Sequence, residues 1–216
     1  MGFLTAAHLQ FLLDGLLWTV GLSLIAFAGG GLLGFLVALG SSYGPRWSRF
    51  GVGLYIKLIQ GTPLLVLLPL AYFGLPAMGL NIAPLTAAGL ALSIYVSAYL
   101  GEIWRGCIES VPRTQAEAAE CLALRWRQRV WHVILPQAVK IATPPTVGFM
   151  VQIVKNTSLA SAIGFVELAR AGQIINNSTF EPFVIFVIVA ALYFALCYPL
   201  SVLSRRLERS FHVAHR

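Results

Sequence analysis

The chain alternates long apolar stretches with short polar segments. Residues 15–45, 58–101 and 182–204 carry no charged side chain. Because a helix needs about 20 apolar residues to cross the hydrocarbon core, the pattern predicts five spans, with the proline pair at 144–145 starting the fourth. The Gly- and Pro-rich segment 74–84 divides the longest stretch in two. The predicted spans cover about 16–39, 52–73, 85–107, 144–165 and 182–204.

Composition supports a membrane protein over the soluble classes. Of the 216 residues, 58% are hydrophobic and 11% are charged, and the mean hydropathy is +0.79. Soluble domains carry about 25% charged residues. We therefore predict an all-α integral membrane protein whose five transmembrane helices form a single domain over residues 1–216. The three cysteines lie far apart and lack metal-ligand spacing, so neither a disulfide framework nor a metal site is expected.

The basic residues fall on one side of this predicted topology. Most of the fifteen lysines and arginines flank span ends that face the same compartment, which the positive-inside rule identifies as the cytoplasm. The N-terminus is then predicted outside and the C-terminus in the cytoplasm. The net charge of +7 thus reports topology, and we expect no nucleic acid partner. The basic residues on this side are Arg46, Arg49, Arg105, Arg113, Arg125, Arg127, Arg129, Lys140, Arg205, Arg206, Arg209 and Arg216.

Residues 112–138, between the third and fourth predicted spans, form a polar cytoplasmic segment with a helical pattern. Thr114 and Glu117 have the spacing of a capping box, which predicts a short helix over about 115–124. Three alanines recur on one face of that helix and would let its backbone come close to a partner surface. These alanines are Ala116, Ala119 and Ala123.

A second short helix is predicted over about 126–133, with Pro136 ending it. Its apolar positions share one face, and three arginines surround them. Such a helix either lies on the membrane surface with its arginines at anionic headgroups or docks on a soluble partner. The residues alone leave both alternatives open. The apolar positions are Trp126, Val130 and Val133, and the arginines are Arg125, Arg127 and Arg129.

Enzymatic motifs are not found in the sequence. There is no Walker A loop, nucleophile elbow or zincin motif, and Gly29–Gly31 lies in an apolar span without a following lysine. We therefore expect a transport subunit that binds no cofactor and is not an enzyme. If transport is driven by ATP, the ATPase is another polypeptide.

Polar side chains inside the fourth predicted span are candidates for a solute pathway, because burying such groups in hydrocarbon is costly. Gln152 and Asn156 lie four residues apart on one helix face, and Phe149 extends that face by one turn. Their amides could bind the ammonium and carboxylate of a zwitterion. The alternatives are hydrogen bonding between helices or an ion pair of Lys155 with an acid such as Glu102. Lys155, Thr157 and Ser158 complete the candidate set.

Two further spacings predict contacts along or between helices. Glu102 and Arg105, one turn apart near the end of the third span, predict a structural ion pair. Gly30 and Gly34 form a G-x-x-x-G pair, which either permits close helix packing or reflects the general frequency of glycine in membrane helices.

The segment Glu117–Ala119, with Ile134–Pro136 downstream, resembles the EAA motif of importer-type ATP-binding-cassette (ABC) permeases. Other motifs, in family order over about 15–206, resemble the polar amino acid permeases of the histidine, glutamine and arginine uptake type. These motifs are Gln60–Leu65, Ala98–Gly106, Val111–Ala119, Leu135–Ala138, Pro144–Pro145 and Lys155–Leu159.

The resemblance implies the permease of a type I importer in the bacterial cytoplasmic membrane, with coupling helices that dock on ATPase subunits holding ATP and magnesium. It also implies an extracytoplasmic binding protein and a second permease chain, identical or paralogous. The coupling residues carried over are Glu117, Ala118, Ala119, Leu122, Ala123, Leu135 and Pro136, and Thr62 and Tyr99 join the pathway candidates. The alternative is a gradient-driven secondary transporter or channel subunit, which predicts inverted repeats that the sequence does not display.

Several positions depart from the family pattern. Ala123 stands where glycine is usual, which keeps a small side chain but removes a flexible point. Asn156 stands where aspartate is common, and the lack of this acid favours an uncharged cargo over a cationic one. The other departures are Arg125 for a helix-capping serine, Cys107 for a glycine and Gln60 for a frequent arginine.

Overall fold

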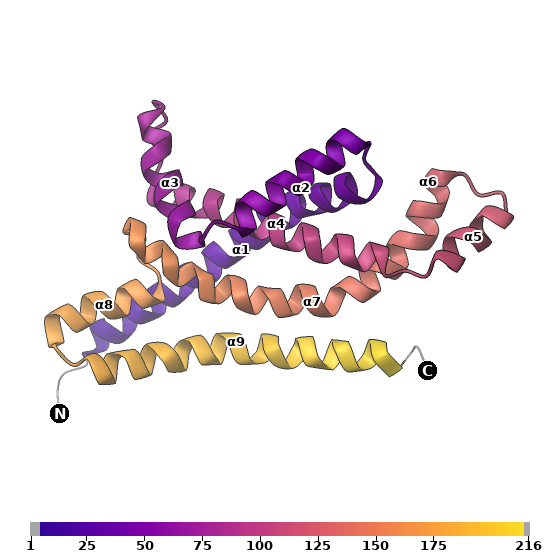
Figure 1. Cartoon of the computed structure of the whole chain (residues 1–216). Helices are drawn as coiled ribbons and strands as arrows, with labels where there is room; N and C mark the ends of the chain where they lie inside the picture. Colours follow the sequence, from indigo (N-terminus) through magenta and orange to yellow (C-terminus); the bar gives the residue numbers. More distant parts are fainter. Residues whose placement is uncertain (1–4, 214–216) are drawn as a thin grey trace.

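The computed structural model describes residues 5–213, and every regular element in that part of the chain is helical (Figure 1). The predicted all-α fold is therefore confirmed. A π-helical turn, Val130–Ile134, joins α6 to α7, and a 3-10 helix, Thr157–Ile163, follows α7. The helices are α1 (Ala6–Tyr43), α2 (Arg46–Gln60), α3 (Leu64–Ala77), α4 (Pro84–Glu109), α5 (Arg113–Cys121), α6 (Trp126–Arg129), α7 (Leu135–Asn156), α8 (Leu168–Thr179) and α9 (Pro182–Val213).

Long helices form the body, with short ones at its ends. Helices α7 and α9 run side by side, α5 and α6 project beyond one end, and α8 lies at the other end (Figure 1). Three helices of the described chain, α1, α4 and α9, are each long and apolar enough to cross a membrane. The number rises to five if each of two bent helix pairs counts as one span.

The second predicted span, 52–73, is not one continuous helix. The chain breaks between α2 and α3, and the two helices meet at 101°. Pro63 lacks an amide proton and disfavours a helical conformation at the residue before it, so α2 ends at Gln60 and α3 restarts at Leu64. The predicted break in 74–84 is present, since α3 ends at Ala77 and α4 begins at Pro84.

The prediction that a helix begins at the proline pair 144–145 is wrong. Helix α7 begins at Leu135 and passes through Pro144 and Pro145 without interruption. Pro136 lies where the π-helical turn passes into α7, so this proline is inside a continuous helical run and does not end a short helix. Inside the helix, each proline lacks the amide proton that would bond to the carbonyl four residues earlier. Ser204 of α9 donates a hydrogen bond to the carbonyl of Pro144 itself at 3.0 Å, which ties α7 to α9 at this level.

The central contact of the body joins α1 to α4 through glycines. A Cβ atom added at Gly30 would lie 2.5 Å from Cβ of Val96, and one added at Gly34 would lie 3.2 Å from the amide nitrogen of Gly101. The two backbones can approach this closely only because these side chains are absent. Of the two alternatives for the G-x-x-x-G pair, the structure supports close helix packing. Around it lies a buried apolar cluster that includes Leu22, Ala26, Leu92, Val96 and Leu100.

A buried carboxylate fixes α8 to the rest of the body. Glu167 is fully buried and accepts hydrogen bonds from the amides of Ala169 and Arg170 at 2.9 and 2.8 Å, and from the Tyr193 hydroxyl at 2.6 Å. The Leu168 amide donates to Oγ1 of Thr19 at 3.2 Å. Glu167 therefore caps α8 and ties it to α9, while Thr19 ties it to α1. No motif or spacing in the sequence singles out Glu167.

Candidate functional site

The projecting segment formed by α5 and α6 is held in shape by its own polar contacts. Nη1 of Arg129 lies 2.6 Å from a carboxylate oxygen of Glu120, which joins the π-turn end of α6 to α5. The Gln128 side chain accepts a hydrogen bond from the Arg125 amide at 2.9 Å, so α6 has a cap although no serine precedes it. The segment is thus an ordered surface at the end of the molecule.

The predicted capping box is not formed. Pro112 is the residue before the first turn of α5, and Thr114 already lies inside the helix, where its hydroxyl cannot cap the start. The small-residue face also points elsewhere than predicted. Ala119 is buried within the chain, and Ala123 lies beyond the last residue of α5. Of the three alanines, Ala119 therefore packs α5 onto its own chain, while Ala116 is half-buried and Ala123 is exposed.

The exposed face of this segment is made by other predicted coupling residues. Glu117 and Ala118 are exposed on α5, and Leu122, just after it, is 76% exposed. Leu135 is buried beneath the segment in a cluster that includes Ile108, and Pro136 is exposed at the start of α7. Of the seven predicted coupling residues, Ala119 and Leu135 thus support the surface, and the others lie on it or beside it.

Ala123 has a left-handed backbone conformation, with φ of +57°. Its amide donates to the carbonyl of Glu120 at 2.8 Å, and the next amide, of Leu124, donates to the carbonyl of Ala119 at 3.2 Å. These bonds close the C-terminal end of α5 as a glycine-type cap does. The conformation explains why glycine suits this position.

A polar and aromatic face runs along α4 and α7. The Tyr99 ring stacks on the Phe149 ring, with ring centroids 5.6 Å apart. The Tyr95 ring lies beside the Tyr99 ring, with ring centroids 4.5 Å apart. The Gln152 side chain donates to Oδ1 of Asn156 at 3.1 Å. The structure therefore brings four predicted pathway residues together and adds Tyr95. Its position four residues before Tyr99, on the same helix face, is the signal that could have identified it.

The remaining pathway candidates do not join this group through hydrogen bonds. The hydroxyls of Thr62, Thr157 and Ser158 donate to carbonyls of their own helices at 2.7–2.8 Å. Thr157 is also fully buried. Lys155 is exposed, and its proposed pairing with Glu102 is not formed in the described chain, where Glu102 contacts Arg105 instead.

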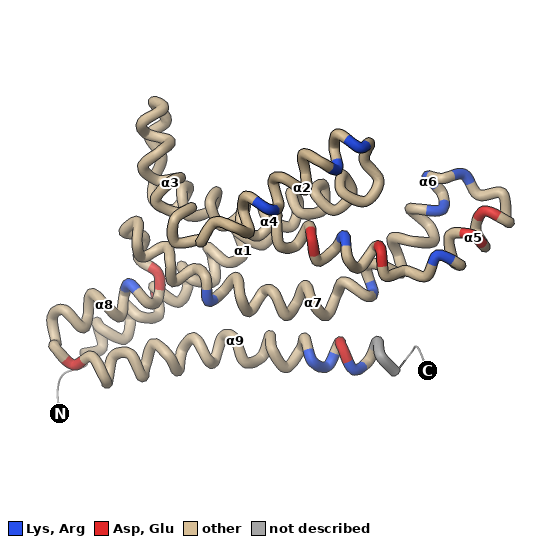
Figure 2. Tube along the Cα trace, in the orientation of Figure 1, with Lys and Arg blue, Asp and Glu red and all other residues tan. Residues whose placement is uncertain are grey.

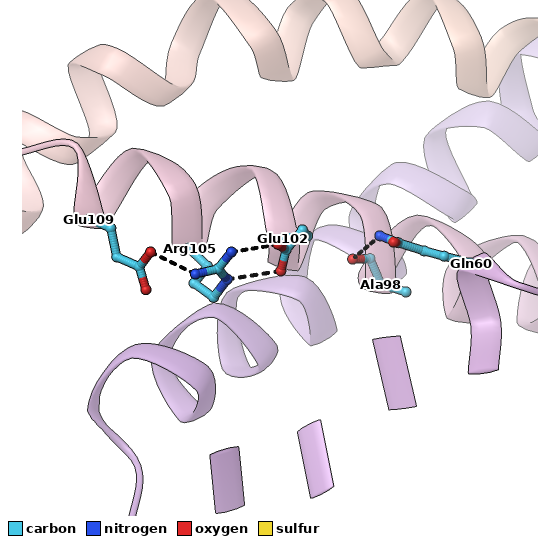
Figure 3. Close-up of polar contacts among 5 residues, drawn as sticks. All are labelled: Gln60, Ala98, Glu102, Arg105 and Glu109. Carbon is cyan, nitrogen blue, oxygen red and sulfur yellow. Dashed lines mark hydrogen bonds and ion pairs between the residues drawn. The ribbon is translucent and has the colours of Figure 1, made fainter. Parts of the chain in front are cut away.

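The ion pair predicted on α4 is present and has a third member. Arg105 binds both carboxylate oxygens of Glu102 at 2.9 and 2.5 Å, and its Nη1 lies 2.6 Å from Glu109 (Figure 3). Gln60 of α2 donates to the Ala98 carbonyl at 3.4 Å, one turn beyond Glu102. We call Glu102, Arg105 and Glu109 the α4 charge ladder.

Charge is distributed unevenly over the described chain. Lysine and arginine residues gather at the start of α2, on α5 and α6, and near the end of α9, at the end of the molecule from which α5 and α6 project (Figure 2). Helix α8, which contains Arg170, lies at the opposite end (Figure 2). Arg216, counted with the basic group from the sequence, lies outside the described residues.

An all-helical body with three to five candidate spans, a polar face inside it and an ordered basic segment at one end defines a membrane-embedded transport subunit. Residues 30–213 match a protein family described as the inner membrane component of binding-protein-dependent transport systems, and the chain belongs to this family. It is therefore a multi-pass permease of the ABC class, in which a partner ATPase subunit hydrolyses ATP. Membership decides against the gradient-driven alternative.

Individual relatives match over nearly the whole chain. The probable glutamine ABC transporter permease GlnM of Bacillus subtilis is 35% identical, and the match covers 92% of this chain and 94% of that one. The glutamine transport permease GlnP of Escherichia coli K12 is 33% identical, with 95% and 94% covered. The crystal structure of an amino acid ABC transporter with histidines has a TM-score of 0.88 at 35% identity, covering 94% and 95% of the two chains.

A more distant structure shares the fold alone. The inward-facing MetNI methionine ABC transporter has a TM-score of 0.77 at 18% identity and covers 96% of this chain and 99% of its own. The fold described above is therefore common to permeases whose sequences differ widely.

Proposed function

We propose that the chain is the permease of an importer for a polar, uncharged amino acid of the glutamine type. The observation that carries this proposal is the near-complete match, at 33–35% identity, to permeases named for glutamine transport and to a solved amino acid transporter. The amide pair Gln152–Asn156 supports it, since these side chains offer both donors and acceptors to a zwitterion.

The proposed assembly has two permease chains, two ATPase subunits and an extracytoplasmic binding protein in the bacterial cytoplasmic membrane. A two-fold dimer supplies two coupling segments for two ATPase subunits. The gathering of basic residues supports a cytoplasmic position for α5, α6 and the C-terminal end of α9, with the N-terminus outside. Lipid surrounds the apolar outer faces, and no nucleic acid partner is proposed.

In the proposed coupling step, the ATPase contacts the exposed face of the α5–α6 segment. Leu122 is the anchor that enters a pocket on the partner, and Glu117 and Ala118 flank it. Buried Ala119 and Leu135 hold the segment against the body, and Ala123 and Pro136 shape its two ends. ATP binds to the partner subunit, and we assign no nucleotide contact to this chain.

In the proposed pathway, the cargo passes along the face formed by α4 and α7. Tyr99 and Phe149 provide a stacked apolar wall, and the Gln152–Asn156 pair provides hydrogen bonds. Lys155 remains a candidate for the cargo carboxylate because its side chain is exposed. Thr62, Thr157 and Ser158 keep a supporting role, because their hydroxyls bond to their own backbone.

The test is ATP-driven uptake by the complete transporter in proteoliposomes. With the binding protein outside and ATP inside, labelled L-glutamine should accumulate, and excess unlabelled glutamine should abolish the signal. Asn156→Ala should lower uptake at least about fivefold, since each lost hydrogen bond to a charged group is worth about 1.5–3 kcal/mol. Asn177→Ala, at an exposed amide of α8, is the matched control. Accumulation that persists without ATP, or that no polar amino acid competes away, would overturn the proposal.

A further inference from the structure

The α4 charge ladder lies in a place where charge is expensive. Glu102 and Arg105 fall inside the predicted span 85–107, and α4 is one of the helices able to cross a membrane. Yet the side chains of Glu102, Arg105 and Glu109 are 39%, 28% and 56% exposed. Charged groups at membrane depth face a water-filled cavity or a protein partner and not lipid, because contact with hydrocarbon costs several kcal/mol.

The position of the ladder around α4 shows which face is open. Glu102, Arg105 and Glu109 recur at intervals of three and four residues, so they follow one stripe of the helix, which begins one turn after the buried Ala98. The other side of α4, which includes Val96 and Leu100, is buried against α1. The stripe therefore points away from the packed core.

The ladder also continues the polar face described above. Tyr99 is the neighbour of Glu102 one turn back on α4, and Gln60 lies against the Ala98 carbonyl at the same level (Figure 3). Polar groups thus extend from the Tyr99–Phe149 stack to Glu109, the last residue of α4. This is the end of α4 from which the basic segment projects (Figure 2).

We propose that the α4 charge ladder lines the cytoplasmic exit of the transport pathway and selects zwitterionic and cationic amino acids over anionic ones. This proposal rests on the proposed function, and it deepens it by assigning the class of cargo charge. Two carboxylates and one guanidinium give the ladder a net charge of −1. The ammonium group of a passing amino acid is attracted to Glu109, the most exposed carboxylate, while its carboxylate is drawn to Arg105. An additional negative charge on the cargo is repelled.

The experiment measures water access and local charge at Gly106, which is exposed one residue after Arg105 and where an added Cβ meets no atom within 4 Å. Gly106→Cys is placed in a transporter whose own cysteines are replaced by alanine. The complete transporter in nucleotide-free proteoliposomes is then treated with a cationic and an anionic methanethiosulfonate reagent. Each rate is divided by the rate of that reagent with free thiol.

A water-lined exit of negative charge gives modification by both reagents, with the cationic one at least about threefold faster. Glu109→Gln in the same background should bring the ratio close to one. Glu208→Gln, an exposed glutamate near the end of α9, is the matched control and should leave the ratio unchanged. Millimolar L-glutamine should slow both reactions at Gly106→Cys.

Three outcomes would overturn the proposal. The first is that either reagent fails to react. The second is that Glu109→Gln leaves the ratio of the cationic to the anionic reaction rate unchanged. The third is that L-glutamine gives no protection in a transporter that imports glutamine. Gln60→Cys, at the end of α2 beside the Ala98 carbonyl, repeats the measurement if the first variant does not assemble with its ATPase. If the transporter neither imports glutamine nor is protected by it, but the ratio of the cationic to the anionic rate is as expected, the result counts against the proposed cargo. The proposal of a charged exit then still stands.

Discussion

Ala123 carries backbone strain at the point where the coupling segment turns. The left-handed conformation raises the free energy of a residue with a Cβ atom by about 1–2 kcal/mol, and glycine has no such penalty. The sequence marked this position only as a departure from a family pattern. The φ of +57° gives the departure a physical meaning: the turn is made, but at a cost that glycine would remove.

Ala123→Gly should stabilise the end of α5 by about 1 kcal/mol, because it relieves this strain. Hydrogen exchange of the amides that follow α5, in the assembled transporter, should then slow roughly fivefold. Ala118→Gly is the control, since the same change at an exposed position inside the helix should speed exchange by a similar factor. Faster exchange in Ala123→Gly would contradict the assignment of strain.

Glu167 illustrates a residue that sequence reasoning could not find. A single acid between Val166 and Leu168 has no spacing or partner visible in the sequence, and its burial depends on contacts with α1 and α9. Only the folded chain shows that its two oxygens accept three hydrogen bonds.

Glu167→Gln should lower the free energy of unfolding by about 1–3 kcal/mol, because one carboxylate oxygen becomes an amide that faces other donors. Tyr193→Phe should cost about 1 kcal/mol, and the double variant should cost less than the sum, since both changes break the same bond. The measurement is the thermal midpoint of the purified transporter. Additive losses would show that the two side chains act independently.

At the scale of whole helices, the predicted helix boundaries differ from the structure where prolines occur. Pro63 ends a helix while Pro144 and Pro145 do not, although all three lie in apolar stretches. Helix α7 packs along α9, where Ser204 donates to the Pro144 carbonyl, and no sequence pattern shows that α9 will lie there. Helix α4, which has no proline after its first residue, runs from Pro84 to Glu109 and contains the predicted 85–107.

Gly30→Val should disrupt the α1–α4 contact, since its side chain would overlap Val96 and force the helices apart. Overpacking of this kind typically costs about 1–3 kcal/mol, so the yield of assembled transporter in size-exclusion chromatography should fall with its thermal midpoint. Gly21→Ala is the control, because a Cβ there meets no atom within 4 Å. Equal behaviour of both variants would argue against close packing at Gly30.

For the molecule as a whole, the sequence predicted at which end the basic residues gather, but not which side chains of the α5–α6 segment are exposed. Helical spacing placed three alanines on one face, but Ala119 is buried while Ala123 is exposed. The spacing of Gln152 and Asn156 did predict their hydrogen bond. The stacking of Tyr99 on Phe149 depends on the register of α4 against α7, which spacing within one helix does not determine.

Leu122→Asp should weaken binding of the ATPase subunit at least about tenfold, because burying a leucine at an interface contributes about 1.5–3 kcal/mol. Pull-down of the ATPase with the purified permease, and its stimulated ATP hydrolysis, should both fall. Phe180→Asp places the same change at an exposed apolar residue after α8, at the other end of the molecule, and should leave both unchanged. Full ATPase retention by Leu122→Asp would rule out Leu122 as the anchor.

The π-helical turn between α6 and α7 joins the α5–α6 segment, the proposed ATPase contact, directly to a long helix. The chain from Trp126 to Ile163 is helical throughout, so no flexible linker separates the segment from the residues of the proposed pathway. Helix α7 has 22 residues and a length of about 33 Å. A tilt of about 10° at its Leu135 end would displace the Asn156 end by about 6 Å. We therefore expect a small movement of the ATPase to become a displacement comparable to the width of an amino acid.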